Sequence, residues 1–154
     1  MVKDGSGRCA DGVEYAEWMS LVNPHQQAAV MRVFEERYAA KKRRRHKGER
    51  CCRCLECGGR AASFDSIAES VFYFERLRPL VDDGSIVDVV IHPRYKLLGP
   101  TYAVYDFEFF DLRSRTFRVL DVKGKGAPLT PSFSRNVKQF EAKYQPLQVE
   151  IVRA

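Results

Sequence analysis

The chain has 154 residues, of which 45% are hydrophobic and 12% aromatic, enough for about one globular domain with a buried core. No apolar run approaches the roughly 20 residues needed to span a bilayer, and the first residues lack the apolar stretch of a signal peptide, so we expect no membrane span and a cytoplasmic location. The 26 Lys and Arg residues outnumber the 20 Asp and Glu residues, and the net charge of +6 favours a polyanionic partner.

The N-terminal part is predicted to contain one long helix that leads into a basic run. Asn23-Pro24 is a typical helix start, and Val30, Phe34 and Tyr38 recur every four residues after it. This apolar stripe either braces the rest of the protein or forms a dimer contact. The basic run is expected to contact nucleic-acid phosphates, with a solvated charged helix face as the alternative. Its residues are Lys41, Lys42, Arg43, Arg44, Arg45 and Lys47.

Four of the five cysteines lie between Cys51 and Cys57, a clustering unlike a disulfide framework. CxxC spacing occurs twice, as Cys51/Cys54 and Cys54/Cys57, and such knuckles place two thiolates on one zinc ion. A second pair with the usual spacing is missing, so His46, Cys9 or a second subunit would complete the shell. The segment predicts either a structural Zn²⁺ held by Cys51, Cys54 and Cys57, or free or oxidised cysteines.

The next segment is predicted to be a helix that begins near Ser66. Glu69 follows three residues later, a spacing that resembles a capping box. Two roles stay open for Glu69: it caps the helix, or it looks inward as a carboxylate of a metal site. The apolar residues of this segment predict a buried stripe made of Ile67, Val71, Phe74, Leu77 and Leu80.

An extended segment from Ile86 to Leu98 follows the helix. His92-Pro93 within it suggests a bulge or a sheet edge. His92 is expected to be a local hydrogen-bonding or surface residue rather than a metal ligand.

Two carboxylates and a lysine are predicted to converge in a hairpin. The strands Tyr102–Phe110 and Thr116–Lys123 flank a turn-prone stretch, and this fold brings Asp106 close to Asp121. Asp121 and Lys123 lie two apart on one strand and therefore project from the same face. Such a set suits a hard divalent cation, with an ammonium placed to handle a water or a phosphate.

The chain after the hairpin begins with a basic loop that contains Lys125. A helix follows and reaches about Tyr144, and residues 147–152 alternate as a final strand. Several cations of the helix are available to face phosphate: Arg135, Lys138 and Lys143.

From Ser66 onward the expected order is helix, strand, strand, strand, helix, strand. This order, with Glu69 in the first helix, Asp106 on the second strand and Asp-x-Lys on the third, resembles the PD-(D/E)xK nuclease superfamily. Short sequence motifs resemble those of small phage-encoded nucleases related to Holliday-junction resolvases. These motifs are F-D-S-x-x-E, D-D-G-x-I, H-P-x-Y-x-L, Y-D-F and D-V-K-G. Tyr105 replaces the proline of the superfamily's name, and Asp121 replaces the commoner glutamate. The match covers about residues 63–152.

The resemblance implies an α/β (α+β) fold, a restriction-endonuclease-like core with a central mixed sheet. Residues 63–154 would form this nuclease core, and residues 1–62 a helical, basic and Cys-rich extension. It implies that Asp106, Asp121 and the carbonyl of Val122 hold Mg²⁺ or Mn²⁺, and that Glu69 holds a second ion or orients its waters. Lys123 would contact the attacking water and the scissile phosphate.

The same resemblance implies a homodimer that makes paired nicks in a four-way DNA junction, in the host cytoplasm if the chain is phage-encoded. The basic residues from Lys41 to Lys47, with Lys125, Arg135 and Lys138, would follow the junction arms. Two alternatives stay open: a nuclease for linear, flapped or damaged DNA, and a non-catalytic, zinc-containing DNA-binding or packaging factor.

Overall fold

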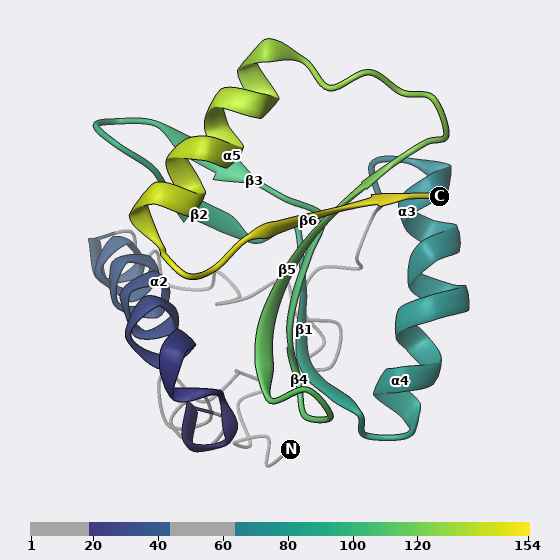
Figure 1. Ribbon diagram of the computed structural model, residues 1–154, viewed down its shortest axis with the longest axis horizontal. Helices are drawn as coiled ribbons and strands as arrows, with labels where there is room; N and C mark the ends of the chain where they lie inside the picture. The colour runs from purple at the N-terminus through teal and green to yellow at the C-terminus, as the bar shows by residue number, and fades with distance from the viewer. Residues whose placement is uncertain (1–18, 44–63) are drawn as a thin grey trace.

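The structure, a computed structural model, describes residues 19–43 and 64–154 (Figure 1). Cys51, Cys54 and Cys57 lie outside the described residues, as do Arg44, Arg45 and Lys47. None of the described helices is long and apolar enough to cross a membrane. The described elements are α2 (Pro24–Arg43), α3 (Ile67–Phe72), the π-helical turn η1 (Tyr73–Leu77), α4 (Arg78–Asp82), β1 (Ile86–Ile91), β2 (Arg94–Lys96), β3 (Tyr102–Val104), β4 (Phe107–Asp111), β5 (Thr116–Lys123), α5 (Pro131–Lys143) and β6 (Val149–Arg153).

The central sheet has four strands in the order β1-β4-β5-β6. β1, β4 and β5 pair antiparallel, and β6 joins β5 in parallel after the crossover through α5. The α/β class with a central mixed sheet is thus confirmed. The two long strands predicted before the hairpin are each divided, because β2 and β3 leave the central sheet and form a separate antiparallel pair.

Helices cover both faces of the central sheet, so that the strands form the middle layer (Figure 1). On one face α2 and α5 pack against a cluster that includes Phe110, Phe117 and Phe140. On the other face the continuous helical segment from α3 to α4 packs Tyr73 and Leu77 against β-strand side chains. Strand alternation supplies both faces, since neighbouring residues of β5 point to opposite sides.

Helix α2 braces the core, which decides between the two roles left open for its apolar stripe. It begins at Pro24, where Asn23 Oδ1 accepts a hydrogen bond of 3.0 Å from the N–H of His25. Val30 and Phe34 are buried in the same cluster as the sheet residues. The helix is also tied down by charge, because the Arg37 guanidinium binds both carboxylate oxygens of the buried Glu108.

The stripe predicted for the helix after Ser66 is wrong at three of its positions. Ile67, Val71 and Phe74 are 83%, 42% and 60% exposed. The inward face instead carries Glu69 and Tyr73, one turn apart, followed by Leu77. Apolar residues recur at helical spacing on more than one face of this segment, so the sequence alone does not decide which face is buried. The π-helical turn at Tyr73–Leu77 also changes the spacing of the positions that face inward. The consequence is functional, because the corrected face points Glu69 toward the sheet.

Candidate functional site

The hairpin of β4 and β5 places Asp106 beside the Asp-x-Lys strand. Phe107 pairs with Leu120 in the antiparallel register, and Asp106 lies one residue before β4. The N–H of Asp106 donates to the carbonyl of Leu120 at 3.0 Å. Asp106 Oδ2 in turn accepts a hydrogen bond of 2.6 Å from the N–H of Val122. The sequence-based expectation that the turn brings Asp106 to the Asp121 end of the strand is met.

Asp121 and Lys123 project from the same face of β5, as the strand period requires. Asp121 is 3% exposed. The Lys123 ammonium lies 2.5 Å from Asp121 Oδ2, and its side chain is 28% exposed. The same ammonium lies 4.6 Å from the centre of the Phe133 ring of α5. Lys123 is therefore held between an acid and an aromatic ring, with part of its side chain exposed to solvent.

Glu69 combines the two roles that its sequence position left open. Its N–H donates to Ser66 Oγ at 3.1 Å, and Ser66 Oγ donates back to Glu69 Oε1 at 3.0 Å. The N–H of Asp65 donates to Glu69 Oε2 at 3.2 Å, so the carboxylate satisfies free groups at the start of the helix. Glu69 is nevertheless 5% exposed and faces the sheet. A capping geometry thus aims a buried carboxylate at the strand ends.

His92 is the site residue that the sequence reasoning missed as a candidate ligand. Its side chain is 8% exposed, so it is not a surface residue, and its imidazole pairs with a residue far away in the sequence rather than with a local group. Nε2 lies 3.0 Å from Glu69 Oε2 and 3.5 Å from Asp65 Oδ2. The potential ligand atoms of Glu69, His92 and Asp106 all lie within 4.8 Å of one another. The only signal in the sequence was a histidine before proline at the end of a strand.

The carboxylates of the site crowd together in a poorly hydrated place. Burial raises the pKa of Asp106 to about 7, and the charges of Asp121 and Glu69 add to the effect, against the hydrogen bond from Val122 and the charge of Lys123. Burial also raises the pKa of Asp121, which the Lys123 ammonium opposes. A divalent cation would offset this crowding, and buried carboxylate oxygens beside an imidazole nitrogen are a suitable donor set. The residues present therefore fit a metal ion.

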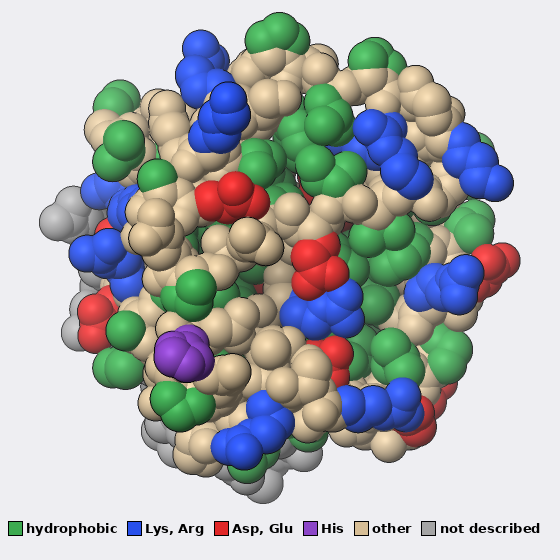
Figure 2. Space-filling view, viewed as in Figure 1, with side chains coloured by type: hydrophobic (Ala, Val, Ile, Leu, Met, Phe, Trp, Pro, Cys, Tyr) green, Lys and Arg blue, Asp and Glu red, His purple; other side chains and the backbone are tan. Residues whose placement is uncertain are grey.

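Several cationic side chains lie on the face of the molecule shown in Figure 2, with apolar and uncharged side chains between them. Lys125, Arg135 and Lys138 are exposed, as a phosphate-binding role requires. Lys143 is not available for that role, because its ammonium binds Glu36 Oε2 at 2.8 Å and the carbonyl of Lys96 at 3.0 Å. Lys143 instead fastens α5 to α2.

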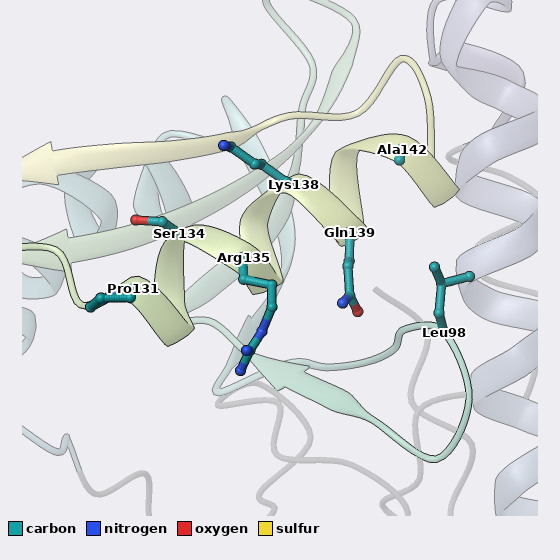
Figure 3. Close-up of a pocket in the computed structure, with 7 residues that line it drawn as sticks. All are labelled: Leu98, Pro131, Ser134, Arg135, Lys138, Gln139 and Ala142. Atoms are coloured by element: carbon teal, nitrogen blue, oxygen red, sulfur yellow. The ribbon is translucent and has the colours of Figure 1, made fainter.

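Arg135 and Lys138 flank an open hollow of about 410 Å³ beside α5 (Figure 3). Leu98 closes it from the β2–β3 connection, and Pro131 and Ala142 lie along the helix. Arg135 and Gln139 point to one side of the helix, whereas Lys138 points to the other. The residues that line the hollow do not include any of the buried acids, so it is a surface feature separate from the site.

Comparisons of the chain with protein-family models, curated proteins and solved structures found no match.

Proposed function

We propose that the protein is a metal-dependent endodeoxyribonuclease of the PD-(D/E)xK type that cuts branched DNA, with a four-way junction as its preferred substrate. One observation carries the proposal: Glu69, Asp106, Asp121 and Lys123, which are far apart in the sequence, meet at one end of the central sheet. Acids with a neighbouring lysine in a buried site are what phosphodiester hydrolysis needs.

The chain path supports the restriction-endonuclease-like arrangement. A helix is followed by the antiparallel strands β1, β4 and β5, then by α5 and the parallel strand β6. This is the order expected from the resemblance, with the β2–β3 pair added between the first and second strands. Three acids along this path support the same arrangement: Glu69 lies in the first helix, Asp106 directly before the second strand and Asp121 near the end of the third.

The proposed roles follow from the contacts of each side chain. Asp106 and Asp121 would hold Mg²⁺ or Mn²⁺ together with the carbonyl of Val122, and Glu69 would hold a second ion or orient its waters. A bound divalent cation supplies a Lewis acid for the phosphoryl oxygens and lowers the pKa of a coordinated water. Lys123, whose ammonium lies beside Asp121 and whose side chain is partly exposed, would contact the attacking water and the scissile phosphate.

DNA is proposed to approach over the cationic surface of α5 and the loop before it, where Lys125, Arg135 and Lys138 are exposed. The basic run that begins at Lys41, Lys42 and Arg43 is proposed as a further DNA contact. Paired nicks across a four-way junction require two sites related by two-fold symmetry, so the working unit is a homodimer. Light scattering of the complex with a junction should give two chains per junction, and a single chain would count against the dimer.

Cleavage of a labelled four-way junction, compared with linear duplex of the same sequence and with and without Mg²⁺, tests the proposal. We expect metal-dependent, symmetric nicks in the junction and little cutting of duplex. Asp121→Asn and Lys123→Ala should abolish cleavage, and Asp121→Asn should bind the junction as tightly or more tightly, because a negative charge near the phosphate is lost. Glu75→Gln, an exposed acid on η1, is the matched control.

The other outcomes are equally definite. Equal cutting of junction and duplex would identify a nuclease for linear DNA, and binding without cutting under any metal would identify a DNA-binding factor. Wild-type cleavage by Asp121→Asn or Lys123→Ala would show that the catalytic assignment is wrong.

A further inference from the structure

His92 has a backbone conformation that is rare for a residue with a side chain. Its φ is +53°, in the left-handed region, and it stands directly before Pro93. Such a conformation is strained and persists only where the surroundings impose it. Here the N–H of His92 donates to the carbonyl of Asp106 at 2.9 Å. The register of β1 also shifts between Val87 and Val90, just upstream. Bulges of this kind re-aim the side chains that follow them.

The strained backbone turns the imidazole of His92 into the group of acids. Nε2 lies 3.0 Å from Glu69 Oε2 and 3.5 Å from Asp65 Oδ2, and the ring is 8% exposed. The elements around the ring thus present carboxylates: Asp65 and Glu69 from the start of α3, and Asp106 from the start of β4. Neither the capping of α3 nor the proposed cleavage chemistry requires a buried imidazole at this position.

The spacing of these atoms matches the ligand shell of a single ion. Donors at about 2.0–2.2 Å from a metal lie roughly 3 Å apart when adjacent and roughly 4.3 Å apart when opposite. The Glu69–His92 contact of 3.0 Å corresponds to an adjacent pair. All three potential ligand atoms fall within 4.8 Å of one another, so one ion between them reaches all three after small side-chain movements.

We propose that His92 is a metal ligand, and that Glu69, His92 and Asp106 form a site selective for a first-row transition-metal dication, such as Mn²⁺, over Mg²⁺. Mg²⁺ prefers oxygen donors in near-ideal octahedral geometry, whereas an imidazole nitrogen favours transition metals. The inference deepens the nuclease proposal and rests on it for the role of the ion. The binding itself is measured on the protein alone, without DNA.

Pulsed electron paramagnetic resonance of the full-length, tag-free protein with Mn²⁺ tests the ligand directly. Modulation from the imidazole ¹⁴N appears only if a histidine coordinates the ion. The variant His92→Asn keeps a residue that tolerates positive φ and offers an oxygen in place of the nitrogen. The modulation should disappear in this variant, and the Mn²⁺ affinity should fall by about 10- to 100-fold. Mg²⁺ affinity, measured by competition, should change much less.

His25→Asn and His46→Asn serve as controls, because these are the other two histidines of the chain. Both should keep the ¹⁴N signal and the Mn²⁺ affinity of the wild type. A wild-type spectrum without ¹⁴N modulation, or equal losses of Mn²⁺ and Mg²⁺ affinity in His92→Asn, would overturn the inference. A circular dichroism spectrum and melting temperature like those of the wild type show that His92→Asn is folded.

The two proposals fail in different ways. A ¹⁴N-coupled Mn²⁺ in a protein that cuts no DNA supports the metal site and rejects the nuclease. Metal-dependent cleavage of junctions without ¹⁴N coupling supports the nuclease and rejects His92 as a ligand.

Discussion

Replacing Asp106 by Asn should make the metal-free protein more stable at alkaline pH. Asn keeps an oxygen that can accept the hydrogen bond from the N–H of Val122, now 2.6 Å from Asp106 Oδ2. It removes a charge that is partly buried and lies near Asp121 and Glu69, the conditions that raise the pKa of Asp106 to about 7. Asp106 is therefore expected to destabilise the metal-free protein, as residues that serve a function often do.

The sign and size follow from linkage between protonation and folding. The folded protein binds the Asp106 proton more tightly than the unfolded chain, whose pKa is near the ordinary 3.8. Below about pH 4 the Asp106 carboxyl is protonated and does not lower the free energy of unfolding. Its destabilising effect grows as the pH rises from about 4 to about 7 and is constant above about pH 7. The pKa difference corresponds to about 4 kcal/mol at pH 8. Contact with water at this partly exposed group reduces the expected effect to about 2 kcal/mol.

Thermal and urea unfolding in EDTA provide the assay, at pH 8 and at pH 4.5. At pH 8 we expect Asp106→Asn to melt about 4–8 °C above the wild type, since 1 kcal/mol shifts a domain of this size by about 2–4 °C. The difference should shrink to less than half at pH 4.5. Glu75→Gln, which removes an exposed charge, should change stability at neither pH. Added Mn²⁺ should stabilise the wild type more than Asp106→Asn.

A single result would refute this reasoning. If Asp106→Asn is no more stable than the wild type at pH 8 in EDTA, or if its advantage is the same at both pH values, crowding of buried charge does not act at Asp106.

Three further predictions concern other parts of the fold. Arg37→Met should lower the free energy of unfolding by about 3–5 kcal/mol, measured in urea, because it leaves the Glu108 carboxylate buried without its cation. Ile67→Ser should change that free energy by less than about 0.5 kcal/mol because Ile67 is exposed, whereas Tyr73→Ala should lower it by about 3–5 kcal/mol because Tyr73 is buried. A larger loss in Ile67→Ser than in Tyr73→Ala would show that the opposite face of the helix is buried. The double variant Arg135→Ala/Lys138→Ala should weaken junction binding and reduce the slope of log K against log salt by about 2, and an unchanged slope would place the DNA elsewhere.

The parts of the site set by local periodicity could be predicted from the sequence. Asp121 and Lys123 share a face because strand side chains alternate, and Asp106 approaches them because a short turn joins β4 to β5. The start of α2 was equally readable, since Asn23 and Pro24 act through their own side chain and ring within one helical turn. Each of these features depends on residues close together in the chain.

The parts that depend on tertiary packing could not be predicted. The helix after Ser66 has two overlapping apolar series, and only the docking of Tyr73 against Phe107 decides which one faces inward. His92 was not expected to be a ligand, since the acids that meet it in the fold, Glu69 and Asp106, are 23 and 14 positions away and no local pattern links them to it. The departure of β2 and β3 from the central sheet likewise follows from packing on α5, through Tyr95 and Phe140.

The placement of the acids on two sides of the sheet has a consequence for the protein during its synthesis. Glu69 comes from the helical layer on one face, whereas Asp121 and Lys123 belong to the face of β5 that α2 and α5 cover. A chain in which only one helical layer has docked on the sheet would have only some of these side chains in position. The complete site would not yet be formed. If the protein cuts DNA as proposed, the activity would arise only at the last stage of folding, and nascent or misfolded copies would leave DNA intact.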